Sequence, residues 1–348
     1  MNNNTRRATL FFLALCACNT GFAEDLDIKI TRLLDEPIIK PFMHPTIGEN
    51  VQGPSLIRVP DWVENPLGRY YLYFADHKGL YIRLAYADSL TGPWQIYAPG
   101  SLQIEDSFFP KEPAHIPDTE LVRMIAVRHG RTRLLHTWGH ELTQPHIASP
   151  DVHVDNENQR IIMYYHGLQE VARQHSRVAT STDGIHFTAR EEDIGRTYFR
   201  VFPHDGMSYA ISKPGQLYRS VDGLSNFEVG PVLLDPNLRH LAVLKRSNLL
   251  YVFWTRIGDA PESILLSTID ISGDWTTWRG SPEQVVLRPE RDWEGARAAI
   301  EPSLTSSAYG MVNQLRDPAI YEEDGRIYLL YAVAGEHGIA IAEVELNE

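Results

Sequence analysis

One pattern recurs five times along this chain after about residue 50. Each copy begins with an apolar strand that starts at a charged or polar residue and continues with a strand rich in Tyr and β-branched residues. Most copies then end in a short hairpin with an aromatic residue. The copies begin near Gly53, Ser149, Phe199, Arg239 and Arg316. A unit of roughly 40–50 residues with about four short strands is typical of a propeller blade, so the sequence predicts an all-β, five-bladed β-propeller.

The fifth copy is one strand short. Its last strand candidate is Ala342 to Leu346, and no fourth strand follows it. The stretch Leu26 to Ile30 alternates apolar and polar residues and belongs to no copy. We therefore expect this N-terminal strand to complete the last blade and close the ring, which removes an exposed edge. Residues 24–348 should then form a single domain.

The first 23 residues have the pattern of a secretory signal peptide. Two arginines precede the short apolar run Leu10 to Ala17, and Gly21 to Ala23 ends in small residues. This pattern predicts cleavage before Glu24 and a periplasmic or secreted protein. A second interpretation is a lipoprotein anchored to the membrane through Cys18, because Leu15 to Cys18 resembles a lipobox.

Cysteine content and charge exclude several classes of protein. Both cysteines lie in the predicted signal, so the mature chain should have no disulfide and no thiol nucleophile. The net charge is −13, which makes nucleic acid a poor partner. No later segment is apolar and long enough for a transmembrane helix.

Propeller geometry places two groups of side chains on one face. The start of each inner strand and the exit of each second strand should meet around the axis, because neighbouring strands alternate in direction. Carboxylates occur in both groups, and glycoside hydrolysis needs two carboxyl groups in different protonation states. We predict Asp317 as base or nucleophile, with Asp151 as a companion that tunes it or exchanges roles with it. Glu336 is the first candidate for the acid, and Glu294, in the irregular segment 279–315, is the second. Each acid could instead cap a turn or lie in a solvated loop.

Other axial residues are candidates for binding the substrate. Arginine at the inner-strand starts could grip a carboxylate or sulfate, or could pair with the axial aspartates. Histidines could donate to sugar hydroxyls, share the acid role or hold a metal. Two tryptophans in irregular segments could stack on a sugar ring. The predicted binding set is Arg200, Arg239, Arg316, His77, His166, His240, Trp62 and Trp293. No cofactor is required, and a structural calcium or other ion in the channel stays open.

Three segments resemble five-bladed propeller glycoside hydrolases, and family 43 in particular. Arg316-Asp317-Pro318-Ala319-Ile320 is similar to the Asp-Pro strand start whose Asp is that family's general base. Ser149-Pro150-Asp151-Val152 resembles its pKa-tuning Asp, and Trp293-Glu294-Gly295-Ala296 resembles the segment with its acid. The base Asp lies in the first blade of family 43, whereas the best match here lies in the last.

Together, these patterns predict a glycoside hydrolase for a neutral or anionic oligosaccharide derived from a polysaccharide. A polysaccharide lyase acting on a uronate glycan and a carbohydrate-binding propeller without catalysis are the main alternatives. A phosphorylase is a weaker one. The lyase would need a Tyr, His or Lys base and a neutralised uronate.

Overall fold

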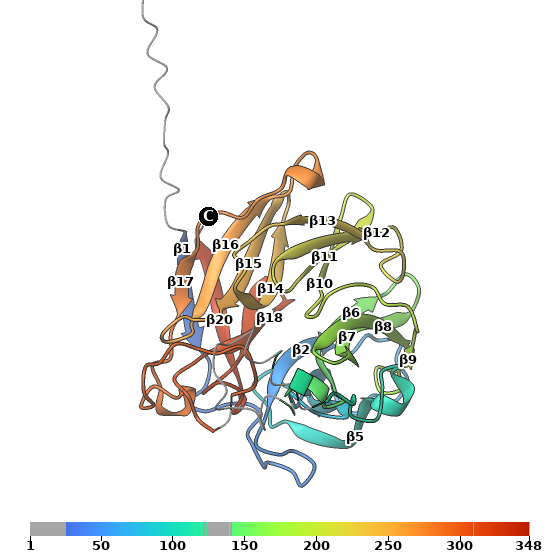
Figure 1. Ribbon diagram of the computed structural model, residues 1–348. Helices are drawn as coiled ribbons and strands as arrows, with labels where there is room; N and C mark the ends of the chain where they lie inside the picture. The colour runs from blue at the N-terminus through green and yellow to red at the C-terminus, as the bar shows by residue number, and fades with distance from the viewer. Residues whose placement is uncertain are drawn as a thin grey trace, which may run out of the picture.

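The computed structural model describes residues 26–117, 119–120, 123, 139, 141–308 and 310–347. The predicted signal peptide, residues 1–23 with Cys18, lies outside the described residues. In the described part, five four-stranded antiparallel sheets are arranged around an axis, which confirms the five-bladed propeller (Figure 1). No helix among the described residues has the length and apolar character needed to span a membrane.

Each blade runs from an inner strand to an outer strand in chain order, except the last. The strands of the first three blades are β2 (Gln52–Arg58), β3 (Tyr70–Ala75), β4 (Tyr81–Ala87) and β5 (Gln95–Gln103); β6 (Ile147–Asp155), β7 (Arg160–Glu170), β8 (Arg173–Ser181) and β9 (Thr188–Ala189); and β10 (Arg200–His204), β11 (Met207–Ser212), β12 (Gln216–Ser220) and β13 (Glu228–Val232). The last two blades contain β14 (Leu238–Arg246), β15 (Leu249–Arg256), β16 (Ile264–Asp270) and β17 (Gln284–Leu287), then β18 (Arg316–Glu323), β19 (Arg326–Ala332), β20 (Ile339–Asn347) and β1 (Asp27–Arg32).

The N-terminal strand closes the ring as predicted. Strand β1 pairs antiparallel with β20, from Asp27 opposite Asn347 to Arg32 opposite Ala342. It alternates between exposed and half-buried residues, and Ile28 and Ile30 pack against the core between the last two blades. An alternating strand of this kind covers one face of a sheet and shields the edge of β20.

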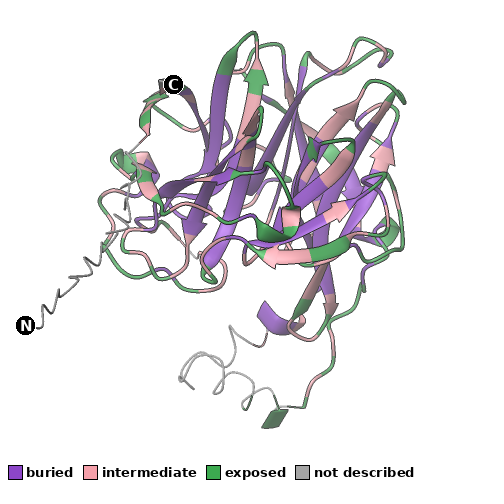
Figure 2. Ribbon diagram, turned by 90° about the horizontal axis from the view of Figure 1, so that it is seen from above, coloured by how far each residue is buried: buried purple, intermediate pink, exposed green. Residues whose placement is uncertain are grey.

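Five large apolar clusters form most of the core, one between each pair of neighbouring blades, and a sixth, small cluster surrounds Leu142. Figure 2 shows the strands largely buried and the connecting loops exposed. Asp-Gly turns join some of these blades: Tyr73 Oη donates to the Gly184 carbonyl, and Tyr164 Oη donates to the Gly223 carbonyl, each at 2.7 Å. The recurring Tyr and Asp-Gly positions in the sequence therefore reflect contacts between neighbouring blades.

Four of the five inner strands share a bulge near their start. The pairing register jumps from Gln52 to Ser55, from Ala148 to Asp151, from Leu238 to Leu241 and from Arg316 to Ala319. In the three of these blades with a proline in the bulge, the residue before the proline has a positive φ: Gly53 at 65°, Ser149 at 49° and Asp317 at 46°. A bulge at this point turns the inner strand at the axis. It also makes Asp317 equivalent to Ser149, whereas Asp151 is equivalent to Ala319.

The irregular segments contain three short 3₁₀ helices, η1 (Ile104–Asp106), η2 (Trp275–Thr277) and η3 (Asp292–Glu294). The last of these opens the segment between the fourth and fifth blades that contains Glu294. Gly295 follows it with φ 85°, where a Cβ would lie 2.1 Å from the Val312 carbonyl oxygen. This glycine is therefore required by both its backbone conformation and its close packing.

Candidate active site

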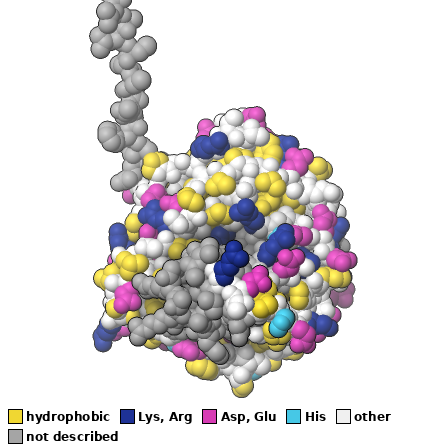
Figure 3. All heavy atoms as spheres, viewed as in Figure 1, with side chains coloured by type: hydrophobic (Ala, Val, Ile, Leu, Met, Phe, Trp, Pro, Cys, Tyr) yellow, Lys and Arg dark blue, Asp and Glu magenta, His cyan; other side chains and the backbone are white. Residues whose placement is uncertain are grey.

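A cavity of about 510 Å³ opens on the face of the ring where the inner strands begin. It is lined by side chains from four blades and from the segment before β6, including His77, Glu141, Tyr198, Lys213 and Arg239. On the face seen in Figure 3, Lys and Arg side chains gather near the centre.

Asp317 lies beneath this cavity and is fully buried. Its Oδ1 is 3.0 Å from Nδ1 of His240, yet neither Asp317 oxygen accepts a hydrogen bond from a described residue. The backbone N–H of Asp317 donates to the same Nδ1 at 3.3 Å, so that nitrogen presents a lone pair. Desolvation and the nearby Glu336 carboxylate raise the pKa of Asp317 to about 8. With this pKa, Asp317 carries its proton at pH 7.

Glu336 is the second buried carboxyl group of the same blade, just after β19. Its Oε1 accepts from Arg316 Nη1 at 2.7 Å and lies 3.3 Å from His77 Nδ1, while Oε2 accepts from Asn50 at 2.6 Å. Desolvation would raise the pKa of Glu336, but His77, Arg316 and Asn50 lower it to about 2. One hairpin thus holds a protonated and an ionised carboxyl group near each other. The expected grouping of Asp317 with Glu336 is present, but their protonation states are the reverse of the predicted roles.

The axial arginines are paired within the protein. Arg239 Nε donates to Glu262 at 2.8 Å, and the other oxygen of Glu262 lies 3.6 Å from Arg316 Nε. Arg200 donates to the carbonyls of Leu241, Pro150 and Phe199 at 3.0–3.2 Å. Of the two alternatives, pairing therefore describes these arginines better than an open basic floor. The partners of Arg239 and Arg316 are glutamates rather than the axial aspartates.

Aromatic rings cover the two carboxyl groups. The Tyr198 ring lies 4.5 Å from both His166 and His240, and His77 lies between Glu336 and the cavity. Desolvation first, and neighbouring positive charges second, hold the pKa values of His166 and His240 well below the usual range. Both imidazoles are thus neutral. Asp317 and Glu336 are both buried, at 0% and 2% exposure.

Asp151 does not join this group, because it follows Pro150 whereas Asp317 precedes Pro318. In the register that both strands share, Asp151 therefore lies two residues, or roughly 6–7 Å, further along the axis. Its Oδ2 accepts from the Val201 backbone N–H at 2.9 Å, as Ser55 Oγ accepts from Val152 one blade earlier. Desolvation would raise the pKa of Asp151, but His153 and Arg200 lower it. The expectation that Asp151 lies beside Asp317 as its companion is therefore corrected. Asp151 instead links the second blade to the third through this hydrogen bond, at a greater depth along the axis than Asp317.

Glu294 is also placed away from the axis. It is fully buried, and its carboxylate binds Arg32 of β1 through two contacts of 2.8 and 2.9 Å. It also accepts from Tyr331 Oη and from the Glu290 and Arg291 backbone. Its neighbour Trp293 packs against the core between the last two blades. Glu294 therefore fixes the closing strand to η3, and this placement contradicts its predicted role as the acid.

Trp62 lines a different cavity from the one above Asp317. Its indole N–H donates to Asn156 Oδ1 at 3.1 Å, at the far end of the axis. Neither tryptophan proposed for stacking thus lines the candidate active site.

Sequence reasoning missed Glu141 and Tyr198. Glu141 Oε1 accepts from Ser307, and Oε2 lies 3.4 Å from Lys78 Nζ and 3.7 Å from His77 Nε2. It belongs to a segment outside the repeat, so no pattern predicts where it lies. Tyr198 directly precedes Phe199, where the third copy begins, and that position could have indicated an axial residue.

No group of three His, Cys, Asp or Glu side chains suited to a metal ion occurs within residues 26–117, 141–308 and 310–347 or the few described residues between them. The predicted open option of a calcium or other ion in the channel stays a prediction.

Several solved structures share this fold. A β-xylosidase/α-arabinofuranosidase of family 43 from a compost microbial metagenome matches with a TM-score of 0.53 and 13% identity, over 91% of this chain and 94% of that one. An endo-1,4-β-xylanase from Bacteroides thetaiotaomicron gives 0.53 and 13%, over 90% and 97%. An N-acetylgalactosamine deacetylase from F. plautii gives 0.53 and 11%, over 91% and 95%. At such identities the likeness establishes the five-bladed fold.

At the sequence level, no family model matches. The chain is 34% identical over 367 aligned positions to uncharacterized protein R118 of Acanthamoeba polyphaga mimivirus, covering 97% of this chain and 94% of that protein. This protein therefore belongs to the same family as protein R118.

Proposed function

We propose that this protein is a glycoside hydrolase whose axial site uses Asp317 as proton donor and Glu336 as the ionised carboxylate. The observation that carries the proposal is the pair itself: one hairpin holds two buried carboxyl groups with pKa values of about 8 and about 2. Glycosidases require one carboxyl group in each state. The propeller fold shared with several glycoside hydrolases supports the same reaction class.

The roles follow from the charges. A neutral Asp317 can protonate the leaving oxygen, and an ionised Glu336 can activate water or stabilise positive charge at the sugar ring. Access requires movement of Tyr198 or His77, which cover the pair. Arg239 is paired with Glu262, but Arg196 and Lys213 also line the cavity and outnumber the acidic Glu141 there. We therefore infer a substrate with a carboxylate or sulfate group.

The test is a screen of the mature protein against neutral and anionic plant and algal oligosaccharides, with products identified by mass. Hydrolysis adds one water to the products, and we expect Asp317→Asn and Glu336→Gln each to lower the rate by about 100-fold or more. Glu228→Gln on β13, an exposed surface change, should leave the rate unchanged. Turnover that survives both axial changes would exclude this mechanism.

The alternatives give other outcomes. An unsaturated product without added water would identify a lyase, although burial raises the pKa of Tyr198 and keeps its phenol protonated. Binding without product would leave a carbohydrate-binding propeller, and a requirement for inorganic phosphate would identify a phosphorylase.

For localisation, we propose a periplasmic or secreted protein, on the basis of the N-terminal sequence alone. N-terminal sequencing of the mature chain should find Glu24 first. A lipid-modified Cys18 would instead establish the anchored form.

A further inference from the structure

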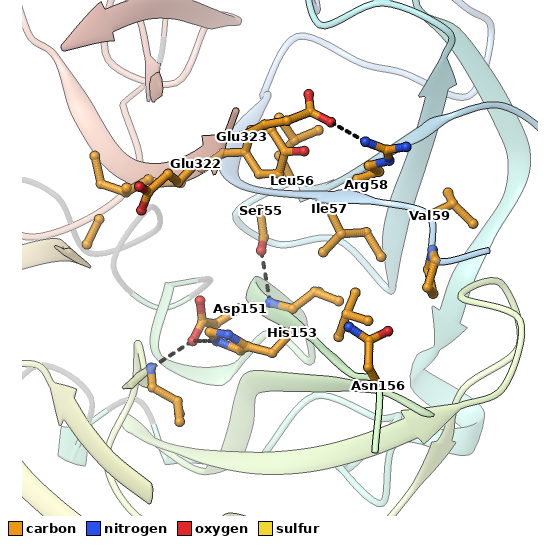
Figure 4. Close-up of a pocket in the computed structure, with 18 of the residues that line it drawn as sticks. Ser55, Leu56, Ile57, Arg58, Val59, Asp151, His153, Asn156, Glu322 and Glu323 are labelled. Carbon is orange, nitrogen blue, oxygen red and sulfur yellow. Dashed lines mark hydrogen bonds and ion pairs between the residues drawn. The ribbon is translucent and has the colours of Figure 1, made fainter. Parts of the chain in front are cut away.

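A second cavity, of about 610 Å³, lies at the opposite end of the axis from the candidate active site. It is lined by the later residues of β2, β6 and β18 and by the loop after β2, whereas the first cavity is lined by residues that precede inner strands or follow second strands. Figure 4 shows side chains of these strands converging on this space, with Asp151 and His153 side by side. A cavity of this volume can enclose a small ligand.

Asp151 and His153 form a fixed polar pair in this cavity. His153 Nε2 is 2.8 Å from Asp151 Oδ2, which also accepts the Val201 N–H. Among the described residues, Asp151 Oδ1 and His153 Nδ1 have no hydrogen-bond partner, and the His153 side chain is 40% exposed. Desolvation would lower the pKa of His153, but the Asp151 carboxylate raises it. The pair thus offers an acceptor and a second ring nitrogen in fixed positions.

Three of the other charged side chains of the cavity, Arg58, Glu322 and Glu323, are in ion pairs, whereas Asp61 is a further acid in its wall. Arg58 Nη1 binds Glu323 at 3.0 Å, and Glu322 binds Arg246 at 2.9 Å. Trp62 forms part of the wall, and its hydrogen bond to Asn156 fixes the indole. An aromatic wall beside a few fixed polar groups suits a ligand with both C–H faces and hydroxyl groups. The paired acids and the ionised Asp151 disfavour an anionic ligand.

We propose that this cavity is a second, non-catalytic site that binds one or two neutral sugar residues. Asp151 Oδ1 accepts from a sugar hydroxyl, His153 Nδ1 makes the neighbouring hydrogen bond, and Trp62 contacts the sugar ring. The site does not depend on the proposed catalytic roles of Asp317 and Glu336. It would hold the neutral part of a glycan chain while the opposite end of the axis acts on another part.

The test uses the full mature chain with the Asp317→Asn change, so that bound sugars are not turned over. Neutral mono- to trisaccharides of xylose, arabinose, galactose and glucose are titrated by calorimetry and by saturation-transfer NMR. His153→Ala and Trp62→Ala, each added separately, should weaken binding by about tenfold or more. His186→Ala serves as the matched control, because His186 pairs with Asp183 in an exposed turn of the same blade.

Thermal unfolding of each variant establishes that it is folded, and His153→Gln and Trp62→Phe replace any variant that is not. The proposal is overturned if none of these sugars binds, or if binding is unchanged in both cavity variants. It is also overturned if His153→Ala in the otherwise unchanged protein abolishes turnover, because the cavity would then be part of the catalytic site. Failure of the hydrolase proposal alone would leave the sugar titration unaffected.

Discussion

His240 Nδ1 and Asp317 Oδ1 lie 3.0 Å apart, and the backbone N–H of Asp317 points at the same nitrogen. His240 is buried, and desolvation followed by repulsion from Arg239 lowers its pKa well below the usual range. A neutral imidazole with its lone pair toward Asp317 cannot form an ion pair with a carboxylate. It can accept a hydrogen bond from the O–H of a protonated carboxyl group. The raised pKa of Asp317 comes from desolvation and the Glu336 carboxylate, and His240 adds no positive charge that would oppose it.

This relationship predicts how stability changes with pH. Asp317 has a pKa of about 8 in the folded protein against an ordinary value of 3.8. Between these values the folded state keeps a proton that the unfolded state releases, so stability falls as pH rises through this window. The slope from this group is at most about 1.4 kcal/mol per pH unit. Asp317→Asn, which carries no titrating proton, should remove that slope.

The measurement is denaturant unfolding of the protein and of Asp317→Asn at several pH values from 4 to 9. The variant should gain stability relative to the parent as pH rises, with the largest gain near pH 8. Groups with lowered pKa values, such as Glu336, titrate at more acidic pH and cancel in the difference. Parallel curves for the two proteins would show that Asp317 is ionised throughout.

Tyr198 should affect the pKa of Asp317. Its ring contacts His240 and covers Asp317 from the cavity, so it contributes to the desolvation that raises the Asp317 pKa. Tyr198→Ala should admit water and bring that pKa back toward 3.8, which makes the pH dependence of unfolding shallower. Tyr198→Phe keeps the ring and should behave like the parent. An unchanged slope in Tyr198→Ala would mean that other groups exclude the water.

Much of the fold follows from the sequence, because blades repeat local signals. Strand alternation, Asp-Gly turns and the missing strand of the last copy predict the five sheets and the closure by β1, and the structure confirms them. Asp324-Gly325 joins β18 to β19 with φ values of 51° and 74° at these two residues, as the turn dipeptide predicts. These features depend on neighbours in sequence, which is why a single sequence contains them.

The site was harder to predict, because it depends on register. Ser149-Pro150-Asp151 and Arg316-Asp317-Pro318 look alike, yet the two strands pair in the same register around the proline. Asp151, which follows its proline, therefore lies two positions further along the axis than Asp317, which precedes its proline. Glu141 belongs to a segment outside the repeat, so its position cannot be predicted from the blade pattern. Glu294 lies away from the axis, where it binds Arg32 from the other end of the chain. The protonation states are equally invisible in a sequence, because they come from burial and from contacts between distant residues.

Mutation of Glu294 tests whether this residue pairs with Arg32 for stability rather than acting as the catalytic acid. Glu294→Gln leaves Arg32 without its buried partner, and breaking such a pair costs about 3 kcal/mol or more of unfolding free energy. Glu290→Gln removes the exposed partner of the same arginine and should cost no more than about 1 kcal/mol. Denaturant unfolding compares the two. Loss of turnover in a Glu294→Gln protein of unchanged stability would restore Glu294 as the acid.

The short strand β1 should contribute strongly to stability, because it completes the ring. Without β1, the edge of β20 would be exposed. Ile30 lies opposite Val344 and packs against the core between the last two blades. Ile30→Asp places a charge on that apolar face and should lower the unfolding free energy by about 2 kcal/mol or more. Lys29→Ala, on the exposed side of the same strand, should change it little. Thermal and denaturant unfolding measure both, and light scattering follows association through the uncovered edge of β20. Equal stability of the two variants would mean that β1 closes the ring by its backbone pairing alone.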